Sequence, residues 1–161
     1  MAILHSQMSG QGQTPDGRIV HIPPAAAMQQ RGPVVQVSIS LAQSFAATLA
    51  QQGSPIPSPV VGFALIDTGA SNTCIDDEAA QAMGLPVIDV GSMQSASHAK
   101  TASNIYPVQI EIIGFRIQFQ SLRTMGAALK PQGLLLLLGR DLLQRCALFY
   151  NGMAGEITLS I

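Results

Sequence analysis

An aspartate, a threonine and a glycine stand together directly after an apolar run in the first half of the chain. The run is Val60–Ile66, and Asp67, Thr68 and Gly69 follow it without a gap. A buried carboxylate needs hydrogen-bond partners, so an aspartate at the end of an apolar strand is either held in a turn or functional. The glycine permits the tight turn that would follow such a strand. Asp67 is therefore the first candidate for proton-transfer chemistry.

A second apolar run that ends at a glycine stands in the second half of the chain. Leu134–Leu138 leads into Gly139, Arg140 and Asp141, and a short helix over Leu142–Arg145 is expected to begin there. The two segments look like paired halves of one pseudo-symmetric core. Asp141 could be a second acid within the same chain, but its place at a helix start favours capping of the helix or a salt bridge.

Short strands are expected around these two segments. Apolar and polar residues alternate, as is typical of half-buried strands, in Val35–Ser40, Phe115–Gln120 and Ile157–Ile161. Another strand, Val108–Ile112, is predicted to turn at Gly114 into the Phe115 strand as a hairpin. The two apolar runs, Val60–Ile66 and Leu134–Leu138, suit strands that are buried on both faces.

Helical signals are sparse. Asp76 can cap a helix over Asp77–Met83, after which Gly84 ends the helix and Pro86 prevents its continuation. Together with the short helix expected near Asp141, this pattern predicts an all-β fold with one or two short helices.

Composition excludes several classes of protein. The 161 residues are 47% hydrophobic and 11% charged, with a net charge of −1. This length suits one domain with an extension, and the low charge excludes a disordered polar chain. The lysines and arginines are scattered, so no basic stripe is present for a nucleic acid. The longest purely apolar run, Leu134–Leu138, is far shorter than the roughly 20 residues of a membrane span.

Cysteine and histidine usage points to a reduced compartment without metal. Cys74 and Cys146 are too few for a disulfide scaffold, and the N-terminal residues lack the pattern of a secretory signal. We therefore expect free thiols and a cytoplasmic location. No histidine has another histidine or a cysteine within four residues, which argues against a zinc site.

The chain from Pro33 to Ile161 resembles the retropepsin-like aspartic proteases, the family of the retroviral proteases and their bacterial relatives. The resemblance is carried by two motifs in the family's order, Asp67-Thr68-Gly69-Ala70 and Leu138-Gly139-Arg140-Asp141-Leu142-Leu143. The strand through Tyr106 to Val108 and the last strand support it. The resemblance implies a closed β-barrel that forms a two-fold homodimer, with no cofactor and no metal.

The resemblance also implies a mechanism, that of an aspartic endopeptidase. Such enzymes use two aspartates that share one proton, because two close like charges cannot both ionise. One carboxylate takes a proton from water while the other donates a proton to the scissile carbonyl of a peptide. Because this chain has one Asp-Thr-Gly, the dyad would consist of Asp67 and its symmetry mate.

Roles for the neighbouring residues follow from the same resemblance. Thr68 matches a threonine whose hydroxyl bonds across the dimer, the Gly69 N–H is expected to donate to the catalytic carboxylate, and Ala70 lines the substrate cleft. Gly139, Arg140 and Asp141 are expected to support the dimer and the fold.

One part of the family pattern is altered. Arg140 matches an arginine that pairs with a carboxylate soon after the catalytic triplet, but Ser71 and Asn72 occupy those positions here. Arg140 therefore needs another partner, for which Asp76 and Asp77 are the candidates.

The resemblance also implies a glycine-rich hairpin that closes over the substrate. It is expected in Val90–Ser103, where the family pattern is altered because only Gly91 is a glycine. Small residues dominate this stretch, and its tip is expected at Ser95, Ala96, Ser97 and His98. A lone loop histidine is more often solvated than functional. Cys74, close to the catalytic loop, is interpreted as a small buried apolar residue rather than as a redox switch.

The first 32 residues differ from the rest in being rich in Gln, Gly and Pro, which favours turns and loose chain. One short strand over Arg18–Ile22 could pack against a partner. We divide the chain into an N-terminal arm, residues 1–32, and a protease domain, residues 33–161. The arm is either a propeptide cut by the enzyme itself or a tether that covers the cleft.

Two other readings compete with the protease. The first is a weakly active or inactive dimer of the same fold that binds peptides, which the altered hairpin and the missing acids after Ala70 favour. The second is a structural β-domain in which the Asp-Thr-Gly triplet is a coincidence.

Overall fold

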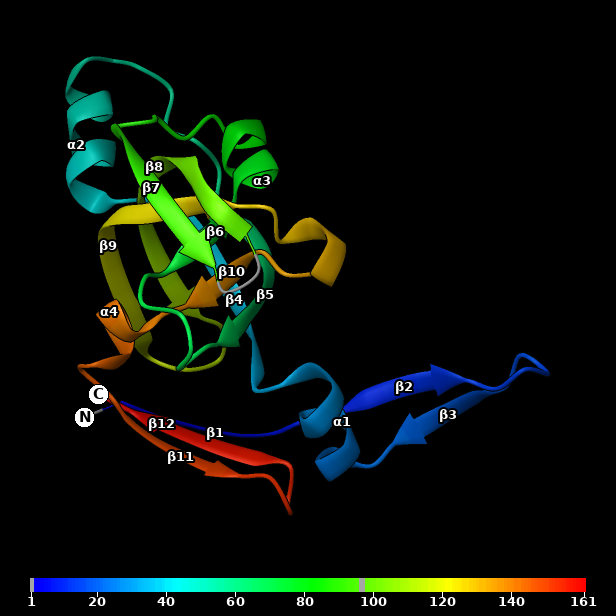
Figure 1. Cartoon of the computed structure of the whole chain (residues 1–161). Coiled ribbons are helices and arrows are strands. Elements are labelled where there is room, and N and C mark those ends of the chain that lie inside the picture. The colour runs from blue at the N-terminus through cyan, green and yellow to red at the C-terminus, as the bar shows by residue number, and fades with distance from the viewer. Residues whose placement is uncertain (1, 96–97) are drawn as a thin grey trace.

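The computed structural model describes residues 2–95 and 98–161 (Figure 1). The strands in chain order are β1 (Ile3–Gln7), β2 (Gly10–Gln13), β3 (Ile19–Ile22), β4 (Val34–Leu41), β5 (Val60–Ile66), β6 (Cys74–Asp76), β7 (Asp89–Ser95), β8 (His98–Ile112), β9 (Ile117–Ala127), β10 (Leu136–Leu138), β11 (Ala147–Asn151) and β12 (Glu156–Ser160). The helices are α1 (Pro24–Arg31), α2 (Gln43–Gln51), α3 (Asp77–Ala82), α4 (Arg140–Leu143) and the 3₁₀ turn η1 (Lys130–Gln132).

Six strands close into a barrel. The ladder runs β4-β5-β10-β6-β9-β8, and an additional β4–β8 pairing closes the ring, while β7 extends from β8 outside it. Closure leaves no free edge in the ring, so the backbone groups of these strands are paired. The prediction of an all-β, retropepsin-like barrel is confirmed.

The two apolar runs pair inside this barrel. β10 lies between β5 and β6, parallel to β5, with Leu138 opposite Ile66 and Leu136 opposite Ala64. The backbone N–H of Asp67 continues the ladder by donating to Leu138 O at 3.0 Å. The two apolar runs therefore lie side by side, and their pairing places Asp67 beside Gly139 at one end of the parallel pair.

Burial of β5 differs from the prediction. Ala64 and Ile66 are buried, but Val61 and Phe63 are 56% and 48% exposed, so this strand is not covered on both faces. The reason is that side chains alternate along a strand, and only one face of β5 points into the barrel core. Leu136 and Leu138 of β10 are buried, while Leu137 between them is partly exposed.

The local signals for α3 and for the β8–β9 turn are confirmed. Asp76 caps α3, since its side chain accepts a hydrogen bond from Ala79 N at 3.0 Å. Ile112 pairs with Ile117 across the turn that contains Gly114, whose φ of +83° suits glycine.

Two helices were missed in the sequence, α1 and α2. Helix α1 begins at Pro24, a favourable first position, but its two prolines and its glutamines resembled loose chain. Helix α2 follows Ala42, which supplies no capping side chain, and it carries no acidic residue in its first turn. Helix α2 therefore showed no start signal, and the proline start signal of α1 was outweighed by the loop-like composition around it.

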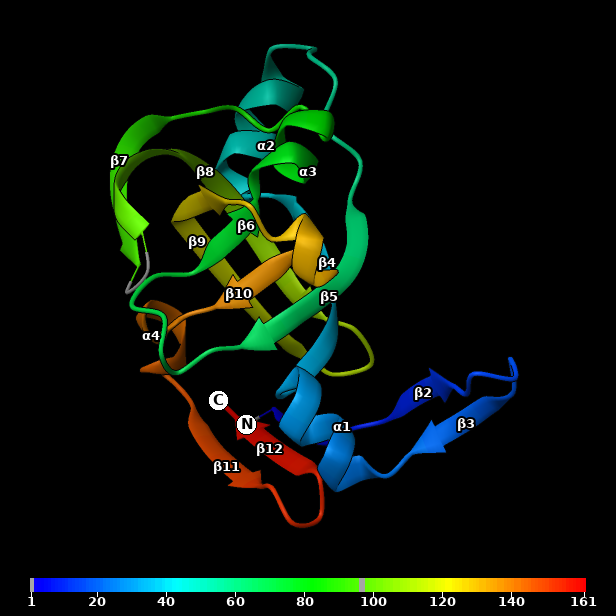
Figure 2. The same cartoon turned by 45° about the vertical axis from the view of Figure 1, so that its right-hand side comes forward.

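The ends of the chain form a second, smaller sheet. β12 pairs with β1 on one side and with β11 on the other, and the two termini lie together in both views (Figures 1 and 2). Leu4 of β1 and Leu159 of β12 are fully buried, so residues from both ends of the chain share the core.

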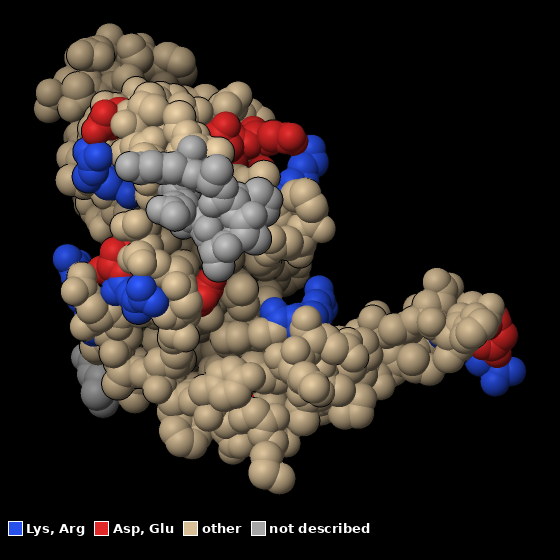
Figure 3. Space-filling view, viewed as in Figure 1, with Lys and Arg blue, Asp and Glu red and all other residues tan. Residues whose placement is uncertain are grey.

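The β2–β3 hairpin projects from the body of the molecule (Figures 1 and 2). Its second strand matches the short strand expected over Arg18–Ile22. Charged side chains are sparse on the face in Figure 3, and the tip of the hairpin carries an ion pair between Arg18 and Asp16 at 3.0 Å. Within the described residues, no helix has both the length and the hydropathy needed to cross a bilayer.

Candidate active site

The loop between β5 and β6, residues 67–73, holds the Asp67 carboxylate in place with its own backbone. Oδ1 accepts hydrogen bonds from Gly69 N at 2.8 Å and from Ala70 N at 3.2 Å. Both donors fix the orientation of the carboxylate. In the part of the chain that the structure describes, Oδ2 has no hydrogen-bond partner, so it is available for proton transfer.

Arg140 braces this loop from the start of α4. Its Nη1 donates to Thr68 O at 2.8 Å and to Gly69 O at 3.1 Å, and its Nη2 donates to Ser71 Oγ at 2.8 Å. The expectation that Asp76 or Asp77 would pair with Arg140 is therefore wrong. The physical reason is that loop carbonyls, which a sequence does not display, satisfy the guanidinium.

Asp76 instead accepts hydrogen bonds from the backbone. It is 4% exposed, and its Oδ2 accepts hydrogen bonds from Leu129 N at 2.9 Å and from Lys130 N at 2.8 Å, while its Oδ1 caps α3. Three backbone donors compensate the burial of this charge. Asp76 thus joins α3 to the segment that precedes β10.

A buried hydrogen-bond chain fastens α4 beneath the loop. Thr73 is fully buried, and its hydroxyl accepts from Gly139 N at 3.1 Å and donates to Asp141 Oδ1 at 2.8 Å. Oδ1 of Asp141 also accepts from Leu142 N. Gly139, rather than Asp141, is the N-cap of α4, so the capping interpretation of Asp141 is wrong by two positions. Nothing in the sequence pointed to Thr73.

Cys74 is buried directly after the loop. Burial, with the negative charges of Asp141 and Asp67, raises the pKa of the Cys74 thiol to about 11. The thiol is protonated at neutral pH and hence a poor nucleophile, since only the thiolate reacts. This agrees with the interpretation of Cys74 as a small buried apolar residue.

The raised pKa of Cys74 predicts a loss of stability at high pH. Below pH 9 the thiol is protonated in both states, and as the pH rises from 9 towards 11 only the unfolded thiol ionises, which favours unfolding. Denaturant titrations of reduced protein should show that this thiol's contribution to the free energy of unfolding falls by about 2 kcal/mol between pH 8 and pH 10.5. Cys74→Ala should lack this component, while Cys146→Ala, at a less buried thiol, should keep it; equal pH dependence in wild type and Cys74→Ala would contradict the prediction.

The predicted Val90–Ser103 hairpin is present as β7 and the first part of β8. Asp89 pairs with Ile105 at its root and Ser95 with His98 near its tip. Ala96 and Ser97 lie outside the described residues, as do the side chains of Ser95 and His98. The far end of β7 lies beside the β5–β6 loop in both views (Figures 1 and 2).

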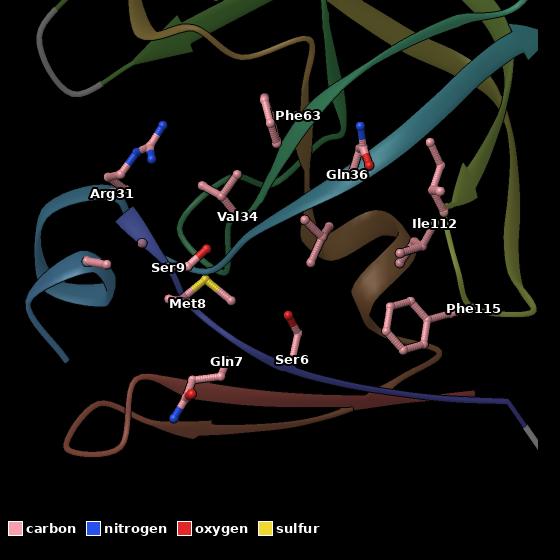
Figure 4. A pocket seen from close by; sticks show the side chains of 14 residues that line it. Ser6, Gln7, Met8, Ser9, Arg31, Val34, Gln36, Phe63, Ile112 and Phe115 are labelled. Carbon is pink, nitrogen blue, oxygen red and sulfur yellow. The ribbon is translucent and has the colours of Figure 1, made fainter. Parts of the chain in front are cut away.

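A pocket lies between β1, α1 and the barrel (Figure 4). Ser6 and Met8 line one side, Val34 and Gln36 of β4 line the other, and Arg31 stands at its edge. Among the described residues its lining includes none of the loop 67–73. This pocket is therefore separate from Asp67. Likewise, no cluster of three metal-ligating side chains occurs within residues 2–95 and 98–161.

Taken together, a six-stranded barrel and an Asp-Thr-Gly loop braced by Gly139 and Arg140 define a retropepsin-like protein. Residues 61–145 match the sequence profile of the family described as "gag-polyprotein putative aspartyl protease". This match spans more than half of the chain, and the chain belongs to this family of retropepsin-like aspartic proteases.

Among solved structures, the chain is similar to a retropepsin-like aspartic protease from Rickettsia conorii, with 14% sequence identity and a TM-score of 0.48. The alignment covers 99% of this chain and 93% of that one. No curated protein gives a significant match.

Proposed function

We propose that the protein is an aspartic endopeptidase whose catalytic dyad consists of Asp67 from two copies of the chain. The observation that carries this proposal is the Asp67 carboxylate, held by Gly69 N at 2.8 Å in a loop that Arg140 braces from below. A carboxylate positioned in this way needs little reorganisation when charge changes during a reaction.

The proposed reaction is direct hydrolysis of a peptide bond by water. The ionised Asp67 takes a proton from water, and the protonated Asp67 of the other copy donates a proton to the carbonyl oxygen. The water oxygen bonds to the carbonyl carbon to give a tetrahedral intermediate. When it collapses, the Asp67 that took the proton from water passes it to the leaving nitrogen, the other Asp67 takes a proton back from a hydroxyl of the intermediate, and the C–N bond breaks to leave a new carboxyl and a new amine. No covalent enzyme intermediate forms.

The arrangement of the loop supports a dyad from two chains. Asp141, the acid of the second motif, accepts hydrogen bonds from the Thr73 hydroxyl and from Leu142 N through its Oδ1. It therefore has a structural role within the chain rather than that of a second catalytic acid. Thr68 and Gly69 are exposed in the single chain, where a second copy could cover them. In this proposal the Thr68 hydroxyl bonds across the dimer axis, Ala70 lines the cleft, and an extended peptide adds as a strand beneath the β7–β8 hairpin.

Activity should depend on protein concentration. Below the dissociation constant of the dimer, the rate of peptide cleavage should rise with about the square of the concentration, because two chains form one site. Cleavage of a peptide library over a dilution series, with sedimentation measured in parallel, tests this. Adding excess Asp67→Asn protein should suppress the wild type by forming inactive mixed dimers, whereas Glu111→Gln protein, altered at an exposed carboxylate, should not. Constant specific activity in a sample that sediments as a monomer would refute the shared dyad.

A peptide-binding dimer without proteolysis is the second candidate. Ser71 and Asn72 stand where the family has acids, and Arg140 donates instead to Thr68 O and Ser71 Oγ of its own chain. This departure from the pattern of the active family favours the second candidate. This candidate predicts that extended peptides bind and remain intact, and that Asp67→Asn leaves their affinity unchanged.

We also propose that residues 1–32 are an arm that stays attached to the domain, residues 33–161, and that the protein is cytoplasmic. Leu4 is fully buried against the C-terminal strand, and Ala27 and Met28 of α1 are buried too, so removing the arm would expose the core. The intact mass should remain that of the full chain after prolonged incubation at the pH of highest activity. Loss of a fragment ending near residue 32, with activity retained, would identify a propeptide instead.

A further inference from the structure

A polar cluster built around the buried Tyr106 joins the root of the β7–β8 hairpin to helix α3. Tyr106 of β8 is fully buried, and its hydroxyl donates to Asp77 Oδ1 at 2.7 Å. The Asn104 amide donates to the same oxygen at 3.1 Å and to the Tyr106 hydroxyl at 3.2 Å. Gln81 Nε2 donates to Asp77 Oδ2 at 2.7 Å. Both oxygens of the Asp77 carboxylate therefore accept hydrogen bonds.

The position of Asp77 in the chain links this cluster to the candidate active site. Asp77 follows β6 directly, and β6 follows the loop that holds Asp67. On the other side, Asn104 pairs with Val90 across the hairpin. The Asp77 carboxylate therefore connects the end of β6, the strand that leaves the active-site loop, to the β7–β8 hairpin through Asn104 and Tyr106 of β8.

The hairpin is fastened at its root and pairs only with itself beyond it. The β8–β9 ladder begins at Ile105, opposite Met125, and in the described strand pairings the residues of β8 before Ile105 pair with β7 alone. Ser103, 5% exposed, donates to Gly126 O at 2.7 Å at the same level. The direction in which the hairpin extends is therefore set at Ser103 to Tyr106.

We propose that Asp77, Asn104 and Tyr106 form a clamp that sets the angle of the β7–β8 hairpin over the active-site loop. These are positioning residues, because they act on substrate through the hairpin. The inference rests on the proposed function, in which a peptide binds between hairpin and loop. Loosening the clamp would weaken peptide binding and leave the chemistry at Asp67 unchanged.

The chemistry of the cluster suits a clamp. Burial raises the pKa of Tyr106, and the hydrogen bond to Asp77 adds to this, so the hydroxyl stays protonated and remains a donor. Hydrogen bonds to a carboxylate are stronger than those between neutral groups, and removing one leaves a polar group under-satisfied. Asp77 also packs against Gly126, where any side chain would collide with its carboxylate.

An ion pair at the same root offers a matched control. Arg123 of β9 donates to Asp89, the first residue of β7, at 2.9 Å, but both side chains are about half exposed or more. Exposed pairs are screened by solvent and contribute little. If position along the hairpin alone mattered, breaking this pair would have the same effect as breaking the clamp.

The experiment compares Tyr106→Phe, Asn104→Ala and the control Asp89→Asn in steady-state peptide cleavage and in hydrogen exchange. Tyr106→Phe keeps the buried ring, and Asn104 is only partly buried, so both variants should fold. Each clamp variant should raise KM about five- to tenfold with kcat within about twofold. The amides of residues 89–95 should exchange about five- to tenfold faster, while those of β10 should not change. Asp89→Asn should stay within about twofold of wild type in every readout.

The two proposals fail separately. If wild type cleaves no peptide, the proposed function fails, and faster exchange in residues 89–95 of Tyr106→Phe still supports the clamp. If wild type cleaves peptides while both clamp variants match it in KM and in exchange, the clamp is refuted and the proposed function stands. Equal effects of Asp89→Asn and Tyr106→Phe would also refute the clamp.

Discussion

Asp67→Asn should abolish peptide cleavage and leave the protein folded. An amide can neither take a proton from water nor share one with a second carboxylate, and in a homodimer the substitution changes both members of the dyad. General acid–base catalysis contributes about 10²–10⁴-fold, so we expect kcat to fall by about 10³-fold or more. The asparagine oxygen can still accept from Gly69 N, which donates at 2.8 Å in the wild type.

The controls for Asp67→Asn separate catalysis from folding. The melting temperature should match or exceed that of wild type, because the substitution removes two carboxyls that cannot both ionise when they face each other across the proposed axis. Glu111→Gln makes the same carboxylate-to-amide change at an exposed position of β8 and should keep full activity. If Asp67→Asn cleaves peptides as fast as wild type, Asp67 is not the catalytic acid and the proposed mechanism is refuted. If wild type and Asp67→Asn both bind peptides and leave them intact, the peptide-binding dimer is supported.

Gly139→Ala should destabilise the protein strongly. A Cβ at Gly139 would lie 2.5 Å from Asn72 O and 2.7 Å from Thr73 N, and both are backbone atoms of the active-site loop. Backbone cannot turn aside as a flexible side chain can, so either the loop or α4 must move. We expect a loss of about 3–5 kcal/mol, seen as a fall in melting temperature of about 10 °C or more.

The same clash should also impair the site. Displacing the loop would break the hydrogen bond from Gly139 N to Thr73 Oγ1 and shift Arg140, which braces Thr68 and Gly69. Any folded Gly139→Ala protein should therefore cleave peptides at least about tenfold more slowly, since small misplacement of catalytic groups is costly. Gly12→Ala is the matched control, because its Cβ would make only ordinary contact with Val20 at 3.5 Å. A melting temperature of Gly139→Ala equal to that of Gly12→Ala would show that the close packing of α4 on the loop is not required.

Local signals explain which strands and helices could be predicted from the amino-acid sequence. The alternation in Val35–Ser40 predicted β4, and Asp76 followed by acidic residues predicted α3. Each of these signals depends on neighbouring residues, because side-chain periodicity and capping act within one turn or one strand. Helices α1 and α2 lacked such signals, and they form because the tertiary structure gives their apolar residues a surface to cover.

The amino-acid sequence by itself determined the closed β-barrel, the turn that presents Asp67, and the membership of the chain in its family. The tertiary structure alone decided the partners of the polar groups: loop carbonyls for Arg140, a buried hydroxyl of Thr73 for Asp141, and Tyr106 with Asn104 for Asp77. It also decided that β1 completes a sheet with β12, at the opposite end of the chain. These contacts join residues far apart in sequence, and a hydrogen bond depends on distance and angle in space, which no local pattern of residue types encodes.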